Sequence, residues 1–243
     1  MQKEKEMWYA EWFNTPYYHI LYKDRDYQEA GAFMQRLTSF LQLQKGDTIL
    51  DLACGKGRHS KFLNTLGFNV TGVDLSPASI AFAKQFENET LSFKEHDMCI
   101  PLAERFDAVF NLFTSFGYFE TENDNIRTIK AIKEELKPGG YGVIDFLNSH
   151  YVATHLVESE IKVVDGITFH IERKIKNNYI LKHISFSHQG TDYNFTEKVK
   201  ALTLVDFKSY FKKAGVTLHH CFGDYTLSPF HKETSQRLIL IFG

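Results

Sequence analysis

The stretch from Ile49 to Lys61, ILDLACGKGRHSK, decides how the rest of the chain is interpreted. It opens with an apolar run, Ile49 to Leu52, which predicts a short buried strand. Gly55 and Gly57 follow at once and indicate a tight turn, in which the backbone takes positive φ or comes close to a ligand. From Arg58 the apolar residues recur at helical spacing. A strand, a glycine turn and a helix in this order can present free N–H groups to a nucleotide-type ligand.

The next apolar run adds a carboxylate to this turn. Residues 69–73 predict a second short strand, and Asp74 ends it roughly twenty residues after the glycines. A carboxylate at this place can accept both hydroxyl groups of a ribose. Two glycines alone more often form a plain structural turn, but the combination with Asp74 indicates an adenosine-containing ligand.

Two ligand classes fit this combination. A dinucleotide fold uses a third glycine for close packing of helix on strand, and this chain has Ser60 there, which weakens a nicotinamide interpretation. The segment Asp51 to Gly57, DLACGKG, instead resembles the first motif of the class I S-adenosylmethionine-dependent methyltransferases, with Ala53 where many members have glycine. The resemblance implies S-adenosyl-L-methionine as cofactor and contacts to it from Asp51, Ala53, Cys54, Gly55 and Gly57.

Further motifs of this family follow at the required spacing and together cover about residues 49–148. The resemblance implies that Asp74 and Leu75 hold the ribose and touch the adenine, and that Asp97 and Met98 meet the adenine. Phe113 begins the loop after the fourth strand, near the methionine end of the cofactor. In the same loop Thr114, Ser115 and Tyr118 are the candidates for lining the acceptor pocket. LKPGG, residues 136–140, precedes the fifth strand as in many members.

The order of elements predicts an α/β fold with a Rossmann-like, mostly parallel sheet. Strands are expected at 49–52, 69–73, 91–95, 106–112 and 141–146, with helices at 58–66, 76–86 and 122–136 between them. A helix from Leu204 to Gly215 and strands at 216–222 and 237–242 resemble the elements that close the class I methyltransferase sheet with an antiparallel strand. In such sheets ligands bind beyond the carboxyl ends of the strands.

Two segments lie outside this alternating order. Residues 151–201 read as a small antiparallel β insertion, which is expected to form either a lid over the methyl group or a dimer surface. Residues 1–45 are expected to form a helical segment covering the cofactor cleft, and the family resemblance places Tyr18 and Tyr22 over the cofactor. The core is then residues 46–150, completed by 202–243.

Composition limits the partners. The 243 residues carry a formal net charge of −2, so nucleic acid is not expected as a partner, and the loop after the fourth strand lacks the Asn/Asp-Pro-Pro-aromatic sequence of amino-methylating DNA enzymes. The three cysteines suggest neither a disulfide framework nor a metal site. No apolar leader and no long apolar run occurs, so a cytoplasmic protein away from membranes is expected, as monomer or homodimer.

The function we expect is methyl transfer from S-adenosylmethionine to a small-molecule acceptor by in-line displacement. A sulfonium methyl group is already activated, so the protein mainly has to hold the acceptor behind it, and the sequence identifies no catalytic base. Arg237 and Asp224 are expected to form salt bridges more readily than to orient a substrate. A cofactor-binding regulator without turnover and a nicotinamide-dependent oxidoreductase are the alternatives.

Overall fold

The computed structural model describes residues 12–23, 27–119 and 121–243, which fall into two compact units. Of the described residues, the smaller unit contains 12–23 and 152–201, and the larger contains 27–119, 121–151 and 202–243. The described part of the expected N-terminal segment thus has residues 12–23 in the smaller unit and residues 27–45 in the larger.

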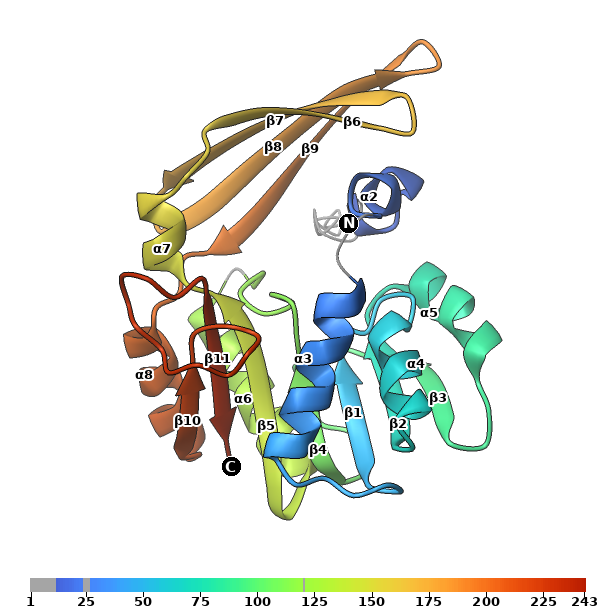
Figure 1. Cartoon of the computed structure of the whole chain (residues 1–243), viewed down its shortest axis with the longest axis vertical. Coiled ribbons are helices and arrows are strands. Elements are labelled where there is room, and N and C mark those ends of the chain that lie inside the picture. The colour runs from blue at the N-terminus through green and yellow to red at the C-terminus, as the bar shows by residue number, and fades with distance from the viewer. Residues whose placement is uncertain (1–11, 24–26, 120) are drawn as a thin grey trace, which may run out of the picture. The chain divides into compact units, whose positions relative to one another are not determined.

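The larger unit is built on a seven-stranded sheet with the order β10-β11-β5-β4-β1-β2-β3 (Figure 1). The neighbours β1 to β5 pair in parallel, whereas β11 runs antiparallel to both β5 and β10. This confirms the mostly parallel sheet with an antiparallel closing strand. The strands are β1 (Thr48–Leu52), β2 (Asn69–Asp74), β3 (Leu91–Glu95), β4 (Phe106–Asn111), β5 (Leu136–Leu147), β10 (Leu218–Phe222) and β11 (Arg237–Phe242).

Helices cover both faces of this sheet. Apolar residues of α3 (Tyr27–Phe40), α4 (Arg58–Thr65) and α5 (Pro77–Ala83) share one core cluster with Ile239 and Ile241 of β11. Phe242, which alternates with them along β11, packs against Phe211 of α8 (Leu204–Ala214). Helix α8 lies against α6 (Glu122–Glu135). Because successive side chains of a strand point to opposite faces, the two helix groups enclose the sheet from both sides. A short 3-10 helix, η1 (Lys84–Phe86), continues α5.

Local sequence signals account for the helix ends. Ser76 caps α5 through its side chain, and Pro77 occupies the first helical position, as predicted. The capping box of Thr203 and Asp206 opens α8, and Gly215 ends it in the left-handed conformation. The strand β5 differs from the prediction: it begins at Leu136 rather than at residue 141. Leu136 already pairs with Phe106 of β4, and the register shifts before the regular ladder begins.

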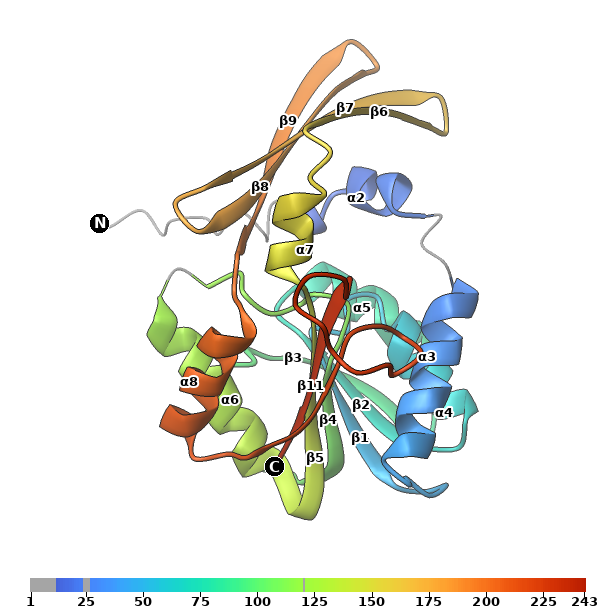
Figure 2. The same cartoon turned by 60° about the vertical axis from the view of Figure 1, so that its left-hand side comes forward.

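The smaller unit is a four-stranded antiparallel sheet with the order β6-β7-β8-β9 (Figure 2). Its strands are β6 (Ser159–Val164), β7 (Ile167–Lys176), β8 (Tyr179–His188) and β9 (Thr191–Lys200), reached from β5 through α7 (Ser149–Thr154). Asn177 and Asn178 form the turn between β7 and β8, with φ of 51° and 62°, as the sequence predicted. The short helix α2 (Pro16–Leu21) packs on this sheet through Leu21, next to the buried ring of Trp12.

The edge strand β6 exposes apolar side chains. Ile161 and Val163 are 64% and 66% exposed.

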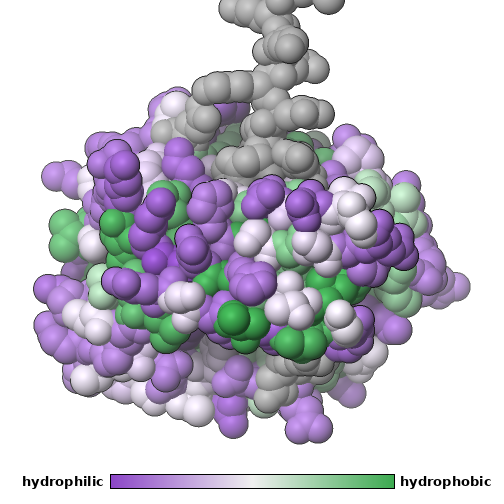
Figure 3. Space-filling view, turned by 90° about the horizontal axis from the view of Figure 1, so that it is seen from above, coloured by the Kyte–Doolittle hydropathy of each residue, from purple (hydrophilic) through white to green (hydrophobic). Residues whose placement is uncertain are grey.

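In the space-filling view of Figure 3, hydrophilic residues occupy most of the visible face, with hydrophobic residues in separate groups between them. Among the described residues no helix is both long and apolar enough to cross a membrane.

Candidate functional site

The predicted site residues of the core meet at one edge of the sheet. Gly55 follows β1, Asp74 ends β2, Asp97 follows β3 and Phe113 follows β4. These four strands are neighbours in the order β4-β1-β2-β3 and run parallel, so their carboxyl ends share one edge. The chain reverses its direction of winding between β1 and β4, and ligands of open α/β sheets bind at such a point.

The turn after β1 has the backbone conformation that its glycines suggest. Gly55 and Gly57 take φ of 55° and 77°. A Cβ on Gly57 would lie 2.5 Å from the ring of Phe93, whereas a Cβ on Gly55 would have no atom within 4 Å. Gly57 is therefore required by packing inside the protein, and Gly55 faces open space that a ligand can fill. Ala53 also has positive φ, 60°, which costs a non-glycine residue about 1–2 kcal/mol.

Asp74 closes this turn. Its Oδ2 accepts the N–H of Gly55 at 2.8 Å, and its Oδ1 accepts the N–H of Ser76 at 2.8 Å. A carboxylate has about four acceptor positions, so these two bonds leave capacity for a further donor. Burial raises the pKa of Asp74, and backbone hydrogen bonds from Ser76, Gly55 and Leu75 act against that shift. The half-buried carboxylate can thus still accept a hydrogen bond from a hydroxyl group of a ligand.

Asp51 lies deeper, under the same turn. Its side chain is 3% exposed and accepts the hydroxyl of Ser60 at 2.6 Å. Burial raises the pKa of Asp51 to about 7, the nearby charge of Asp74 adds to the shift, and the Ser60 bond opposes it. The neighbouring Cys54 is buried, and burial raises the pKa of its thiol. The thiol of Cys54 therefore stays protonated, and the backbone N–H of Cys54 donates to the carbonyl of Val73 at 2.9 Å.

At the ends of β3 and β4 the structure adds Asn111, which the sequence analysis did not single out, to the predicted residues Asp97 and Met98. Asp97 accepts the N–H of Cys99 at 2.9 Å and remains half-buried. Asn111, at the end of β4, is fully buried and donates to the carbonyl of Leu52 at 3.3 Å and to Met98 Sδ at 3.6 Å. Asn111 thus ties together the ends of β1 and β4 and the predicted adenine contact Met98. Only the three-dimensional pairing of β1 with β4 reveals it.

The loop after β4 has a strained backbone. Phe113 and Thr114 both take positive φ, 57° and 64°. Non-glycine residues in this region cost on the order of 1–3 kcal/mol each and persist only where neighbouring groups fix them. Ser115 donates its hydroxyl to the carbonyl of Leu112 at 2.9 Å, and Tyr118 is half-buried.

The groups that fix this loop form a cluster of Asp145, Arg237 and Tyr225, which we call the Asp145 cluster. Asp145 is fully buried, and Arg237 contacts its Oδ1 through Nε at 2.8 Å and Nη2 at 2.7 Å. Tyr225 donates its hydroxyl to Asp145 Oδ2 at 3.3 Å. The expected salt bridge of Arg237 is thus confirmed. Asp224 instead accepts bonds from Thr226 and Ser228 inside its own turn.

Tyr18 and Tyr22 lie in the smaller unit. The hydroxyl of Tyr22 donates to Glu197 at 2.6 Å, and the ring of Tyr18 lies edge-on to that of Trp12 at 5.8 Å. Both tyrosines therefore belong to the aromatic layer that packs on the β6–β9 sheet. Their contact with a cofactor stays a prediction.

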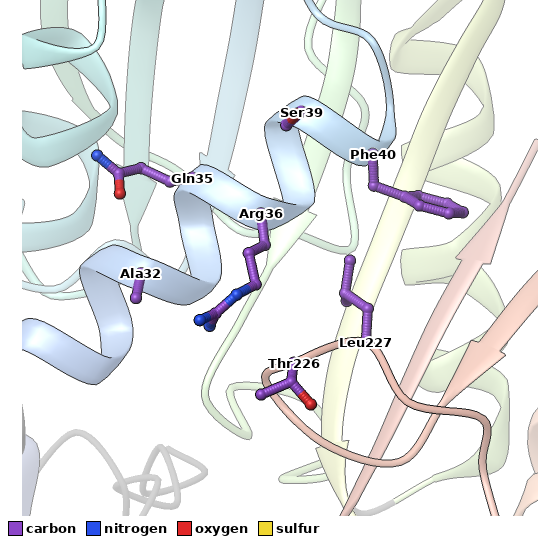
Figure 4. Close-up of a pocket in the computed structure, with 7 residues that line it drawn as sticks. All are labelled: Ala32, Gln35, Arg36, Ser39, Phe40, Thr226 and Leu227. Atoms are coloured by element: carbon purple, nitrogen blue, oxygen red, sulfur yellow. The ribbon is translucent and has the colours of Figure 1, made fainter.

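A pocket of about 600 Å³ lies elsewhere in the larger unit, between α3 and the turn that contains Thr226 (Figure 4). Its lining includes Arg36 and Phe40 of α3 and Leu227, and none of the predicted cofactor residues. Within residues 12–23, 27–119 and 121–243 no three His, Cys, Asp or Glu side chains are grouped so that they could hold a metal ion.

The edge of the sheet fits an adenosine compound with a cationic tail. Asp74 offers acceptor positions for ribose hydroxyls, and Gly55 leaves room beside it. Asp51 and Asp74 place two carboxylates at one turn, which favours a positively charged group.

Comparison with known proteins agrees with this geometry. Residues 49–140 match the family described as "Methyltransferase domain". The chain is 31% identical over 189 residues to "Putative methyltransferase YqeM" of Bacillus subtilis, covering 73% of this chain and 76% of that protein. It is 24% identical over 190 residues to dTDP-3-amino-3,4,6-trideoxy-alpha-D-glucopyranose N,N-dimethyltransferase of Streptomyces venezuelae, covering 74% of this chain and 79% of that protein.

A solved structure shares the fold over nearly the whole chain. The crystal structure of an S-adenosylmethionine-dependent methyltransferase from Clostridium acetobutylicum superimposes with a TM-score of 0.78 at 22% identity, covering 93% of this chain and 95% of that one. None of these comparisons supports a nicotinamide-dependent oxidoreductase or a regulator without turnover. The motif at residues 51–57, the carboxylate at the end of β2 and the sequence relatives agree, and the chain belongs to the class I S-adenosylmethionine-dependent methyltransferases.

Proposed function

We propose that this methyltransferase acts on a small-molecule acceptor. In this proposal the turn after β1 and Asp74 bind the cofactor, and the loop after β4 lies at the methyl group and the acceptor. The observation that carries the proposal is the Asp74 carboxylate, which holds the turn through Gly55 and keeps acceptor positions free. S-adenosylmethionine supplies a methyl group on a positively charged sulfur, and an acceptor displaces it in line. The protein then needs to orient the two partners and exclude water.

We assign the residue roles from the family resemblance, and the positions at the sheet edge support this assignment. Asp74 and Leu75 are assigned to the ribose and the adenine, and Asp97 with Met98 to the far side of the adenine. The residues of the β1 turn are assigned to the methionine part: Asp51, Ala53, Cys54, Gly55 and Gly57. Phe113 is assigned to the methyl end, and Thr114, Ser115 and Tyr118 to the acceptor.

The class of acceptor is inferred from charge and from the relatives. A net charge of −2 does not favour a nucleic-acid backbone. The relative from Streptomyces venezuelae is named for an amino sugar linked to a nucleotide, so amines of small polar molecules are the first acceptors to test.

The test is release of S-adenosylhomocysteine from S-adenosylmethionine with a panel of amino sugars, amino acids and phenols. We expect turnover with at least one compound in the wild-type chain and none with Asp74→Ala. Lys137→Met is the control, because it removes an ion pair with Asp107 at the opposite end of β4. Cofactor binding without product on any acceptor would favour a regulator, and binding of NAD alone would overturn the proposal.

The smaller unit is proposed to serve the acceptor side as a lid, with a dimer surface as the alternative. Its exposed edge residues Ile161 and Val163 agree with either role. Deletion of residues 159–200 separates the two roles: a lid predicts altered turnover and acceptor choice with an unchanged oligomeric state. A dimer surface predicts that a dimeric wild-type chain becomes monomeric.

A further inference from the structure

The loop after β4 is held by bonds that come from distant parts of the chain. The N–H of Phe113 donates to Asp145 Oδ2 at 2.8 Å, and the N–H of Thr114 donates to the carbonyl of Asp145 at 2.9 Å. Arg237 Nη2 donates to the hydroxyl of Thr114 at 2.9 Å. Both non-glycine residues of the loop with positive φ are thus bonded to the Asp145 cluster, through two backbone N–H groups and one side-chain hydroxyl.

The cluster also fixes the ring that starts the loop. Tyr225 lies 5.7 Å from the ring of Phe113 and 4.6 Å from that of Phe33 in α3. The guanidinium of Arg237 lies 5.4 Å from the centre of the Tyr225 ring. On its other side Phe113 packs at 4.2 Å against His59, at the start of α4. The loop is therefore clamped between β5, β11 and the helix that follows the glycine turn.

Stability alone explains this cluster poorly. A buried ion pair is costly to desolvate, and apolar residues of similar size often stabilise a core equally well. Arginine has a specific advantage here, because its fork reaches Asp145 through Nε and Nη2 and Thr114 through Nη2 at once. A lysine carries the same charge on one nitrogen and lacks this geometry.

We propose that Arg237 and Asp145 are positioning residues that hold Phe113 and Thr114 in the strained loop conformation in which the acceptor meets the methyl group. This inference rests on the proposed function, since it assigns the loop to the acceptor side. The residues act through the loop and not by contact with the reacting atoms.

The test uses hydrogen exchange in the full chain, with two variants that weaken the cluster by different routes. Arg237→Lys keeps the charge, and Thr114→Val removes the hydroxyl at nearly constant volume. In both we expect amides within residues 112–118 to exchange about tenfold faster than in the wild type. Thr114→Ser keeps the hydroxyl and should restore wild-type exchange, and Lys137→Met should leave this segment unchanged.

Kinetics then separate positioning from cofactor binding. With the acceptor that the S-adenosylhomocysteine assay identifies, both variants should lower kcat about tenfold, while the dissociation constant of S-adenosylhomocysteine changes by less than about threefold. Unchanged exchange in Arg237→Lys and Thr114→Val, or equal defects in Thr114→Ser, would overturn the inference. If the wild-type chain methylates nothing, the proposed function fails, and the exchange measurement decides the positioning by itself.

Discussion

The buried carboxylate of Asp51 predicts that cofactor affinity depends on pH in the physiological range. Burial and the nearby Asp74 raise the pKa of Asp51 to about 7 in the free protein. The ammonium group on the amino-acid part of the ligand favours the ionised carboxylate, so the affinity is retained above this pKa and lost as the pH falls through it. If only the ionised form binds, the dissociation constant is about tenfold larger at pH 6 than at pH 8.

The perturbation that isolates Asp51 is Asp51→Asn, which keeps the shape and the acceptor for Ser60 but does not titrate. Calorimetric titration with S-adenosylhomocysteine at pH 6, 7 and 8 measures the slope of the dissociation constant against pH for both chains. We expect Asp51→Asn to bind more weakly at pH 8 and to lose most of this slope. The same slope in variant and wild type would show that another group titrates, and the assignment of Asp51 to the cofactor site would be refuted.

Three predictions concern the stability of the fold, each measured by urea unfolding. Gly57→Ala should cost about 2–4 kcal/mol, because it adds strain at φ of 77° and a contact of 2.5 Å with Phe93. Gly46 also has positive φ, but a Cβ there would have no atom within 4 Å, so Gly46→Ala should cost only the backbone strain. Equal losses of unfolding free energy in the two variants would contradict the packing argument. Glu135 is 1% exposed and its Oε2 lacks a partner within the described residues, and burial raises its pKa to about 7. The folded state then holds a proton that the unfolded state releases, so stability falls as the pH rises from about 4.5 to 7, by roughly 3 kcal/mol, and Glu135→Gln should remove that fall. An identical pH profile in that variant would refute the assignment. Thr203→Ala should cost about 1 kcal/mol by removing the capping box of α8, and no change would show that the helix is held by packing alone.

The sequence was sufficient to predict those parts of the fold and of the site that depend on residues close together along the chain. The turn at Gly55 and Gly57, the carboxylate of Asp74 and the cap at Ser76 are each local, so their residue types indicate the backbone conformation directly. Because the carboxyl ends of parallel strands meet at one edge of the sheet, the sequence was enough to predict that Asp74 and Asp97 lie at one site.

Contacts between distant residues were not accessible in this way. Arg237 and Asp145 are 92 positions apart and meet only because β11 pairs with β5. The hydroxyl of Tyr225 reaches the same carboxylate from a turn, and no spacing in the sequence marks it. Likewise, the aromatic residues near Trp12 indicate a packed layer, but composition does not say which sheet they cover.

The cofactor site can be tested most directly by calorimetric titration of the wild-type chain and of Asp74→Asn with S-adenosylhomocysteine, with NAD as the comparison ligand. The account predicts that the wild-type chain binds S-adenosylhomocysteine and not NAD. It further predicts that Asp74→Asn weakens this binding at least about tenfold, because the ribose hydroxyls lose a charged acceptor. Binding of NAD with no response to S-adenosylhomocysteine, or full affinity in Asp74→Asn, would contradict it.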